Sequence, residues 1–485
     1  MKKQKIIFRA DANSIIGHGH VNRCIALAEI LCDDFDVTIA IQEPDLLLHE
    51  SLSSTFKEII VLPIGKTNQE FDEELYPFLN GTEIVVIDGY SFNDKYEKSV
   101  RLKSSIVLTI DDVPSRHYAS DYIINYCEGL NQFDYSKEFY TQLFIGIKYL
   151  FLRNPFLRKD SRRDTRGLSL LINMGGSDPQ NETRRILMEI IDSNYNGDIN
   201  VVIGSSYKHL DSLLIIVNSA KNVHLKRNLS AMEMFDLMSN SPIAILPPSI
   251  VSLEYLSTGG KLLVVRTAEN QSCLYNFIIN KRLGFDYSKI AVKKADELPP
   301  PVEDVQLFFD GKSLERLRRL FTVIGENANL KLRLANADDS ILCYDWVNDP
   351  SVREYSYSKS TIRLDDHMKW FSKKICDSNS KYYIAIMDTN PVGQIRFDKD
   401  LYDNYIISYM IAKDWRGRGL GVLILIKGIL LLQDEAKGKK IIGFVQHSNF
   451  PSIRAFETLG FKKFLDEKHQ NSYRFELNFD MNEDY

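Results

Sequence analysis

Two glycines and two histidines near the start of the chain form the first group of residues that could do chemistry. A short apolar stretch, Ile6–Phe8, is followed by Gly17-His18-Gly19-His20 at the mouth of an expected helix. Glycines let backbone N–H groups approach a ligand closely, because no Cβ stands in the way. The helix N-terminus carries partial positive charge that suits a phosphate or diphosphate. A histidine placed there can take a proton from water while a departing nucleotide is held nearby.

The same residues also have ordinary structural explanations. A Gly-x-Gly is a common turn, His18 fits a turn, and Cys24 fits the buried face of a helix. Two histidines do not make a metal site, and the sequence shows neither a partnering carboxylate nor a cysteine cluster, so we predict no metal. The six cysteines are scattered without CxxC spacing, which also argues against a disulfide scaffold.

Length and composition are those of an ordinary multidomain globular protein. At 485 residues the chain is too long for one core and predicts two to four domains. The net charge of −5 argues against nucleic acid or an anionic membrane as the main partner. Neither a signal-peptide h-region nor an apolar run of membrane-spanning length is present, so we expect a cytoplasmic protein.

Short apolar runs rich in β-branched residues alternate with helical patterns over the first part of the chain. Such continuous runs are typical of strands buried on both faces of a parallel sheet. The first series is Ile6–Phe8, Val37–Ile41, Ile84–Ile87, Ile106–Ile110 and Tyr122–Ile124, and the second is Leu168–Ile172, Asn200–Ile203, Val223–Leu225, Ile243–Leu246 and Leu262–Val265. Two series predict an α/β fold with two doubly wound domains, residues 1–150 and 151–325, and a ligand between them at the strands' carboxyl ends.

Polar residues follow several of these expected strands, where a parallel sheet would bring them to one edge. They are Asp88 with Tyr90, Asp111 with Asp112, Asn125, Gly176, Ser249, Asn270 and Gln271. The turn at Gly175-Gly176 suits backbone contact with a diphosphate, and Glu254, on the helix after Ser249, suits ribose hydroxyls. Each residue alone is explained as a helix cap or turn, but their repetition at strand ends favours one shared site.

The first motif closely resembles the signature of a hydrolase family. Its residues are Arg9-Ala10-Asp11, Ile16-Gly17, Gly19-His20-Val21 and Arg23-Cys24. They are similar to those of the UDP-2,4-diacetamido-2,4,6-trideoxy-β-L-altropyranose hydrolases, which belong to the pathway to pseudaminic acid, a bacterial nine-carbon sugar. Later motifs follow in the family's order, so the resemblance covers roughly residues 5–290. It implies a GT-B-like pair of Rossmann-like domains, with the nucleotide held mainly by the second.

This resemblance implies a metal-independent, inverting hydrolysis. His20 would be the general base that activates water for attack at the anomeric carbon, with UDP leaving by C–O cleavage. Asp11 would orient or tune that histidine, and Tyr90 would contact the sugar. The other implied contacts to the nucleotide sugar come from Gly17, Gly19, Gly176, Ser249, Glu254, Asn270 and Gln271. Relatives carry a histidine where this chain has Gly89, so no role is carried over to that position.

A second glycine-rich motif lies further along the chain, after an expected strand that ends near Ile411. Its residues are Arg416, Gly417, Arg418, Gly419 and Gly421, and an apolar helical stretch follows. Successive amides at a helix N-terminus can hold a pyrophosphate. The motif resembles the acetyl-CoA loop of GCN5-related N-acetyltransferases (GNAT), and Asn449 and Ser452 match the residues that approach the pantetheine arm in that family. The resemblance implies an α+β GNAT domain over residues 330–480, with acetyl-CoA as co-substrate.

The proton-transfer groups of this expected domain stay open. Many GNAT members place a tyrosine at the position of Phe456 to protonate the departing thiolate, and phenylalanine has no proton to donate. For the base that acts on the acceptor amine, His367, Tyr409 and Asp414 are all candidates. Catalysis would then depend mostly on holding the amine against the thioester.

The two resemblances together predict one bifunctional enzyme of the pseudaminic acid pathway. It would use acetyl-CoA to acetylate the 4-amino group of UDP-4-amino-4,6-dideoxy-N-acetyl-β-L-altrosamine. It would then hydrolyse the product to free sugar and UDP. The expected partners are therefore a UDP-linked amino sugar and acetyl-CoA, and the formation of a homo-oligomer is left open.

Two alternatives remain at this stage. A GT-B glycosyltransferase fused to an acyltransferase differs only in admitting a sugar acceptor in place of water. A nucleotide-sugar-binding scaffold without turnover would find its best support in Phe456, whereas His20 and the intact glycine motifs speak against it.

Overall fold

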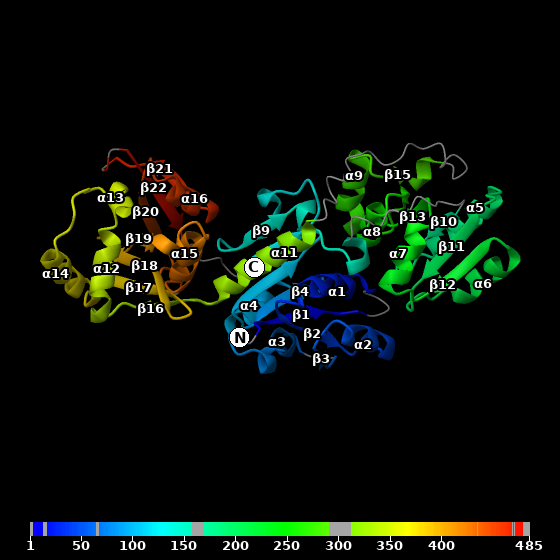
Figure 1. Cartoon of the computed structure of the whole chain (residues 1–485), viewed down its shortest axis with the longest axis horizontal. Coiled ribbons are helices and arrows are strands. Elements are labelled where there is room, and N and C mark those ends of the chain that lie inside the picture. The colour runs from blue at the N-terminus through cyan, green and yellow to red at the C-terminus, as the bar shows by residue number, and fades with distance from the viewer. Residues whose placement is uncertain are drawn as a thin grey trace. The chain divides into compact units, whose positions relative to one another are not determined.

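The computed structural model divides the chain into two compact units, Met1–Ile324 and Gly325–Tyr485 (Figure 1). The residues that the structure describes are 3–12, 17–64, 67–157, 169–290, 312–433, 435–467, 469 and 471–478. Within these ranges no helix is both long and apolar enough to cross a bilayer.

The first unit contains a seven-stranded sheet in the order β3-β2-β1-β4-β5-β7-β9, in which every pairing is parallel. Its strands are β1 (Lys5–Ala10), β2 (Asp36–Gln42), β3 (Glu58–Leu62), β4 (Ile84–Asp88), β5 (Ile106–Ile110), β7 (Tyr122–Asn125) and β9 (Gln142–Ile145). The helices between them are α1 (Gly19–Leu31), α2 (Leu46–Ser53), α3 (Asn68–Asp72) and α4 (Asp94–Lys103). Because β1 lies between β2 and β4, the strand order reverses beside β1, where open α/β sheets bind ligands.

A second parallel sheet in the same unit has the order β12-β11-β10-β13-β14-β15. Its strands are β10 (Ser169–Ile172), β11 (Asp198–Ile203), β12 (Val223–Arg227), β13 (Ile243–Leu246), β14 (Lys261–Val264) and β15 (Phe285–Asp286). Its helices are α5 (Glu182–Asp192), α6 (Leu210–Ser219), α7 (Ala231–Ser239), α8 (Ile250–Ser257) and α9 (Ser272–Asn280). Here the order reverses beside β10, so each sheet has one switch point.

Both expected series of strands are therefore present as parallel sheets. The apolar runs form strands because they are buried on both faces, as in β4 and β5, where every residue is buried. Within these two sheets three strands are additional to the expected ones: β3 and β9 at the edges of the first sheet and β15 at one edge of the second. A separate two-stranded sheet of β6 (His117–Tyr118) and β8 (Ser136–Lys137) is also additional. The proline-rich stretch 293–301, where the sequence pattern loosens, and nearly all of the acidic C-terminal tail lie outside the described residues.

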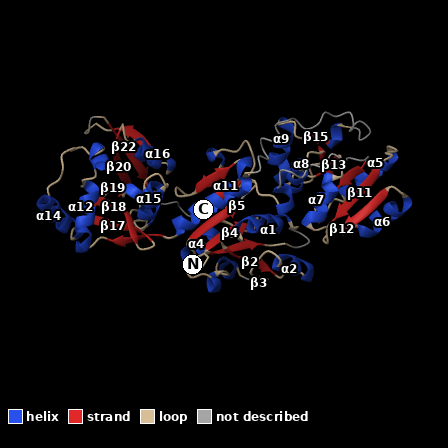
Figure 2. Ribbon diagram, viewed as in Figure 1, coloured by secondary structure: helices blue, strands red, loops and turns tan. Residues whose placement is uncertain are grey.

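The second unit is built on one mostly antiparallel sheet in the order β16-β17-β18-β19-β20-β22-β21 (Figure 2). Its strands are β16 (Leu330–Leu334), β17 (Ser380–Met387), β18 (Asn390–Lys399), β19 (Tyr405–Ile411), β20 (Lys440–Gln446), β21 (Lys462–Leu465) and β22 (Ser472–Asn478). Its helices are α12 (Ser340–Val347), α13 (Pro350–Glu354), α14 (Leu364–Ile375), α15 (Leu420–Leu430) and α16 (Phe450–Thr458). Helix α11 (Ser313–Ala328) ends just before β16.

Strands β19 and β20 form a parallel pair that opens along its length. The pairing runs only from Tyr405 to Ile407 on β19 and from Ile441 to Gly443 on β20. Both strands continue beyond these residues, so a wedge opens between their carboxyl-terminal ends. Helix α15, which is almost wholly apolar, packs on this sheet, and a Cβ on Gly428 would lie only 2.6 Å from Ile395 Cδ1.

Candidate functional site

His20 forms a close pair with a carboxylate of the neighbouring strand. It lies in the first turn of α1 and is buried, and its Nδ1 is 2.6 Å from Oδ1 of Asp88, the last residue of β4. When Nδ1 carries the ring proton, the carboxylate accepts it and the lone pair is on Nε2. The sheet order brings the two together, since β1 pairs with β4 and α1 follows β1 directly.

Arg23 lies one turn further along α1 and holds the same carboxylate from a second side. Its Nε is 2.9 Å from Oδ2 of Asp88 and its Nη2 is 2.5 Å from Oδ1, a bidentate ion pair. Nη2 also lies 2.8 Å from Nδ1 of His20, so this ring nitrogen faces both the Asp88 carboxylate and an arginine N–H. Burial opposes the charge of Arg23, but Asp88 and Asp112 together raise its pKa well above the usual value.

The network continues through Asp112 and Tyr90 to the second sheet. Arg23 Nη1 donates to Asp112 at 2.9 Å, and Tyr90 donates its hydroxyl to the same carboxylate, 2.9 Å from both oxygens. Asn270, which follows β14, donates to the Tyr90 hydroxyl at 2.8 Å. The Tyr90 ring meets the His20 ring edge-on, with 4.7 Å between centroids. Burial and the Asp112 charge raise the pKa of Tyr90, so its phenol stays neutral.

Three backbone turns meet in front of α1. Gly17 has a φ of +78°, which favours glycine, and the next residue, His18, lies with Nε2 3.3 Å from Oγ of Ser206. Ser206 and Gly204 belong to the turn that follows β11. A Cβ placed on Gly204 would lie 2.7 Å from both Cα and O of Gly176, so this turn touches the turn at Gly176. The first turn of α1 has no acidic residue. Exposed amides at these turns and at the helix N-terminus suit an anion such as a diphosphate.

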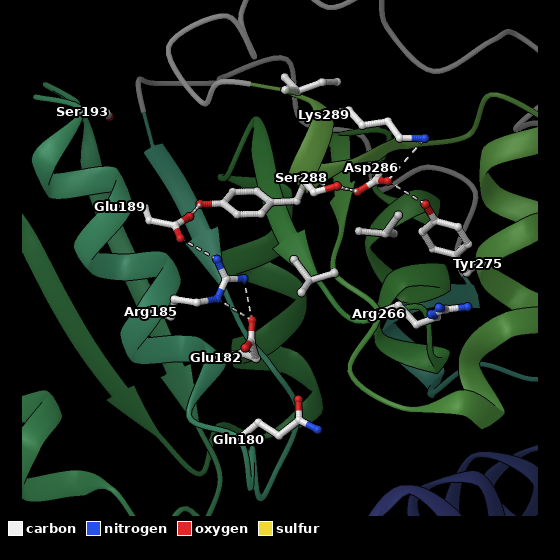
Figure 3. Close-up of a pocket in the computed structure, with 14 residues that line it drawn as sticks. Gln180, Glu182, Arg185, Glu189, Ser193, Arg266, Tyr275, Asp286, Ser288 and Lys289 are labelled. Atoms are coloured by element: carbon white, nitrogen blue, oxygen red, sulfur yellow. Dashed lines mark hydrogen bonds and ion pairs between the residues drawn. The ribbon is translucent and has the colours of Figure 1, made fainter.

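A pocket of about 1020 Å³ lies elsewhere on the second sheet, beside α5, β14 and β15 (Figure 3). Most of its charged side chains are paired with one another, Arg185 with Glu182 and Glu189, and Lys289 with Asp286, whereas Arg266 contacts the Ser272 hydroxyl. None of the residues of the His20 network lines it, so we do not assign it a role.

The second unit carries a groove of about 890 Å³ at the wedge between β19 and β20. Gly417 and Gly419, both at positive φ, and Gly421 line one end of it, where α15 begins. Asn449 and Ser452 line it from α16, and the Asn449 side chain caps that helix by accepting from the Ser452 amide at 3.2 Å. The groove thus combines a glycine loop at a helix N-terminus with an open strand pair, a form suited to a long pyrophosphate-bearing ligand.

Comparisons with known proteins account for both units. Residues 329–462 match the family model described as an acetyltransferase (GNAT) domain. The UDP-2,4-diacetamido-2,4,6-trideoxy-β-L-altropyranose hydrolase of Campylobacter jejuni is 23% identical over 288 residues, 58% of this chain and 99% of its own length. The chain is a fusion of a hydrolase-like part and a GNAT domain.

A relative with the same extent exists. The uncharacterised protein MJ1062 of Methanocaldococcus jannaschii is 24% identical over 503 residues, which cover 98% of this chain and all of that protein. Among solved structures, spermidine N-acetyltransferase from Vibrio cholerae in complex with CoA and spermine is 16% identical, with a TM-score of 0.28, over 31% of this chain and 95% of its own.

The structure corrects two expected roles in the hydrolase-like part. Asp11 does not orient His20: its Oδ1 accepts from Arg9 at 2.6 Å and from the Gln42 amide at 2.9 Å, and Asp88 takes the place beside the imidazole. Glu254 is not an open carboxylate for ribose, because both of its oxygens accept from Arg153 at 2.7 Å. It is buried and the pair is bidentate, so a sugar would have to compete with an arginine.

The other expected residues of this part fall into two groups. Gly17, Gly176, Tyr90 and Asn270 lie in or beside the network and the turns described above, and Gly19 begins α1 with nothing within 4 Å of a Cβ placed on it. Ser249 precedes α8 without a side-chain capping bond, and Gln271 accepts from the Thr267 amide at 2.8 Å, so it shapes the loop that carries Asn270.

The sequence places Asp88 and Asp112 at strand ends that share one site, but it assigns no particular contact to them, to Arg23 or to His18. The i, i+3 spacing of His20 and Arg23 places both on one face of α1. Their partnership depends on which strands are neighbours, which that pattern does not reveal. Across the described residues no group of three or more His, Cys, Asp and Glu side chains is arranged to hold a metal ion.

In the GNAT domain the expected loop residues lie at the groove, but two side chains point to protein partners. Arg416 donates to Ser351 Oγ at 2.5 Å and to the Ile411 carbonyl at 3.0 Å, and Arg418 stacks over Trp415 at 4.7 Å. With the two arginine side chains in these positions, the backbone amides of the loop are the groups left to contact a pyrophosphate.

The three candidate bases of the GNAT domain differ in whether they line the groove. His367 is buried and its Nε2 is 3.0 Å from the Ser340 carbonyl, and burial lowers its pKa. Of the three, Tyr409 is among the described residues that line the groove, whereas His367 and Asp414 are not.

Proposed function

We propose that the chain catalyses two consecutive reactions on a UDP-linked amino sugar. The GNAT domain acetylates the 4-amino group of UDP-4-amino-4,6-dideoxy-N-acetyl-β-L-altrosamine with acetyl-CoA. The hydrolase-like part then releases UDP from the UDP-2,4-diacetamido-2,4,6-trideoxy-β-L-altropyranose so formed. The observation that carries the hydrolysis is the His20–Asp88 pair beside a cluster of glycine turns.

His20 is the general base of the hydrolytic step. Asp88 holds the proton on Nδ1, so Nε2 takes a proton from water as the water oxygen attacks the anomeric carbon. The bond from that carbon to the diphosphate oxygen breaks, and the configuration inverts because water attacks opposite the leaving group. The amides at the N-terminus of α1 and at Gly176 stabilise the charge that develops on UDP.

The two parallel sheets support a GT-B-like arrangement, with residues 1–150 and 151–325 as its two Rossmann-like domains. Tyr90 and Asn270 come from the two different sheets and are joined by a hydrogen bond, as expected of residues that face one sugar. The GNAT domain, residues 330–480, binds acetyl-CoA with its pyrophosphate at Gly417–Gly421 and its pantetheine arm along Asn449 and Ser452.

Product analysis tests this proposal. The full chain is incubated with the UDP-4-amino sugar, with and without acetyl-CoA, and free CoA, UDP and sugar are followed by thiol assay, mass spectrometry and NMR. We expect CoA release first, then UDP release with inversion, and little UDP release when acetyl-CoA is omitted. Acetylation without UDP release unless a sugar acceptor is added would instead establish the glycosyltransferase alternative.

A further inference from the structure

The groove of the GNAT domain holds few groups that can give a proton. Among its described lining residues none is Asp, Glu, His, Lys or Cys, and the titratable or charged ones are Tyr355, Tyr357, Tyr409, Arg416 and Arg454. Arginine does not deprotonate in proteins. A proton donor for the departing thiolate must therefore be a tyrosine, a serine or the threonine of this groove, or water.

Phe456 is not merely without a hydroxyl; its ring is fixed in the core. It is 2% exposed, and it stacks on Phe475 with 5.1 Å between centroids and an interplanar angle of 16°. A Cβ on Gly443 would lie 2.5 Å from Cζ of Phe456, so the tip of the ring packs against the backbone of β20. The position used by many relatives for proton donation is closed to that chemistry in this chain.

Tyr409 lies next to this ring, on the opposite side of the wedge. It stands two residues beyond Ile407, the last residue of β19 that pairs with β20, and its ring meets that of Phe456 edge-on, with 6.0 Å between centroids. Its Cε2 is 3.5 Å from where a Cβ on Gly421 would lie, at the start of α15. Its hydroxyl donates to Ser452 Oγ at 3.1 Å. The phenol thus lies between the glycine loop and α16.

This position is on the path that an acyl-CoA would follow. A pyrophosphate at the glycine loop leaves the pantetheine arm to run past Ser452 into the wedge, and Tyr409 lies two residues from Ile407, where the wedge closes. Burial raises the pKa of Tyr409, so the phenol is protonated at neutral pH and able to donate.

We propose that the Tyr409 hydroxyl donates its proton to the sulfur of acetyl-CoA as the thioester breaks. This rests on the acetyl transfer proposed above. The amine nitrogen forms a bond to the carbonyl carbon, the C–S bond breaks with its electron pair going to sulfur, and the phenol proton moves to sulfur to give the free thiol. The proton lost by the amine goes to solvent, from which the phenolate is reprotonated.

The test compares two phenols of the GNAT domain in the full chain. Tyr409→Phe should lower kcat for CoA release by about 10²-fold, the scale of a lost general acid, with KM for acetyl-CoA within about twofold of wild type. Tyr383→Phe, which removes the hydroxyl of a buried tyrosine that does not line the groove, should stay near wild type. The acceptors are the UDP-4-amino sugar and, separately, water in the slow hydrolysis of acetyl-CoA.

A second measurement separates proton donation from packing. Replacement of Tyr409 by 3-fluorotyrosine lowers the pKa of the phenol with little change in size, so the basic limb of the kcat–pH profile should move to lower pH. An unchanged profile, or a Tyr409→Phe variant at wild-type rate, overturns the assignment and leaves the proposed function standing. If the wild type transfers acetyl to neither acceptor, both proposals are overturned.

Discussion

The two candidate sites differ in how they hold charge. Around His20 the hydrolase-like part holds one buried arginine, Arg23, between the carboxylates of Asp88 and Asp112. The described lining of the GNAT groove has no carboxylate, and its glycine loop lies at the N-terminus of α15. Under the proposed function the first site moves a proton at a fixed atom, and the second holds two reactants together.

The difference has an energetic side. Buried ion pairs cost desolvation and repay it only when the geometry is good, so a site that keeps several of them uses them for orientation. Arg23 meets Asp88 through two nitrogens, which fixes the carboxylate and through it the plane of the imidazole. The GNAT groove avoids that cost, and its described lining leaves hydroxyl groups and water as the proton donors.

The largest effect is expected from removal of the base. His20→Gln should reduce UDP release by roughly 10³-fold, because water is no longer deprotonated as it attacks. Acetyl transfer by the same variant should remain near wild type, since the GNAT groove contains no part of the network. Parallel assays of UDP and CoA release check both statements, and UDP release near the wild-type rate would remove His20 as base.

Asp88→Asn should have the next largest effect on UDP release, a loss of about 10²- to 10³-fold in kcat. An amide can present its NH₂ group to Nδ1, which favours the tautomer with the proton on Nε2 and so removes the lone pair that takes the proton. The variant also leaves Arg23 with one carboxylate fewer, so thermal unfolding is measured alongside. Tyr90→Phe is the matched control, because it removes one hydroxyl of the network without touching the imidazole nitrogen. If kcat for both variants fell equally, an orienting role for Asp88 would be contradicted.

A glycine comparison tests the diphosphate cradle. Gly204→Ala should raise KM for the UDP-sugar several-fold and lower stability, because its Cβ would lie 2.7 Å from the Gly176 backbone and one turn must shift. Gly19→Ala, where a Cβ meets nothing within 4 Å, should fold as the wild type does. Steady-state kinetics and thermal melts of both variants check this. Equal melts for the two would mean that the close approach of the turns does not matter.

The smallest effect is a contrast in acid stability between the two units. Burial raises the pKa of Asp111, despite hydrogen bonds from Tyr118 and Tyr135. The contribution of Asp111 to the free energy of unfolding is therefore largest at low pH, and it declines as pH rises from about 4 through the folded-state pKa. Burial of Asp398 acts upward, but Arg396 and Lys374 outweigh it and lower its pKa. The contribution of Asp398 to the free energy of unfolding is therefore complete above about pH 4 and is lost as pH falls through the folded-state pKa of Asp398.

Hydrogen exchange of peptides from each unit, with Asp111→Asn and Asp398→Asn as variants, measures this contrast. The stability gap between wild type and Asp111→Asn should narrow as pH rises, and the gap for Asp398→Asn should narrow as pH falls below 4. Parallel trends in the two units would contradict the opposite pKa directions.

Much of the fold could be predicted from the sequence because its strongest patterns are local. Continuous apolar runs such as Ile84–Ile87 can hardly be anything but buried strands, and glycines before apolar helices mark ligand loops. Edge strands such as β3 and β15 were missed because their residues are partly exposed and lack that pattern. The sequence also drew attention to His20 and to the loop before α15.

Partnerships between distant side chains were not predictable in the same way. Asp11 is close to His20 along the chain, yet Asp88 contacts it, because β4 is the neighbour of β1 and Asp11 is held by Arg9. In the same way, Glu254 forms an ion pair with Arg153, which is 101 residues away in the sequence. Strand order and long-range ion pairs decide which acid faces which base, and neither is encoded in spacing along a single segment.

The hydrogen bond from Asn270 to Tyr90 has a consequence for turnover. It joins two uncharged groups and contributes about 1 kcal/mol to stability. The contacts that connect Tyr90 to His20 through Asp112, Arg23 and Asp88 are instead all made by residues that belong to the first sheet and its helices and loops. Under the proposed function, a product that leaves between the two sheets has to part only this neutral bond. The contacts of His20 with Asp88 and Arg23 then persist from one turnover to the next.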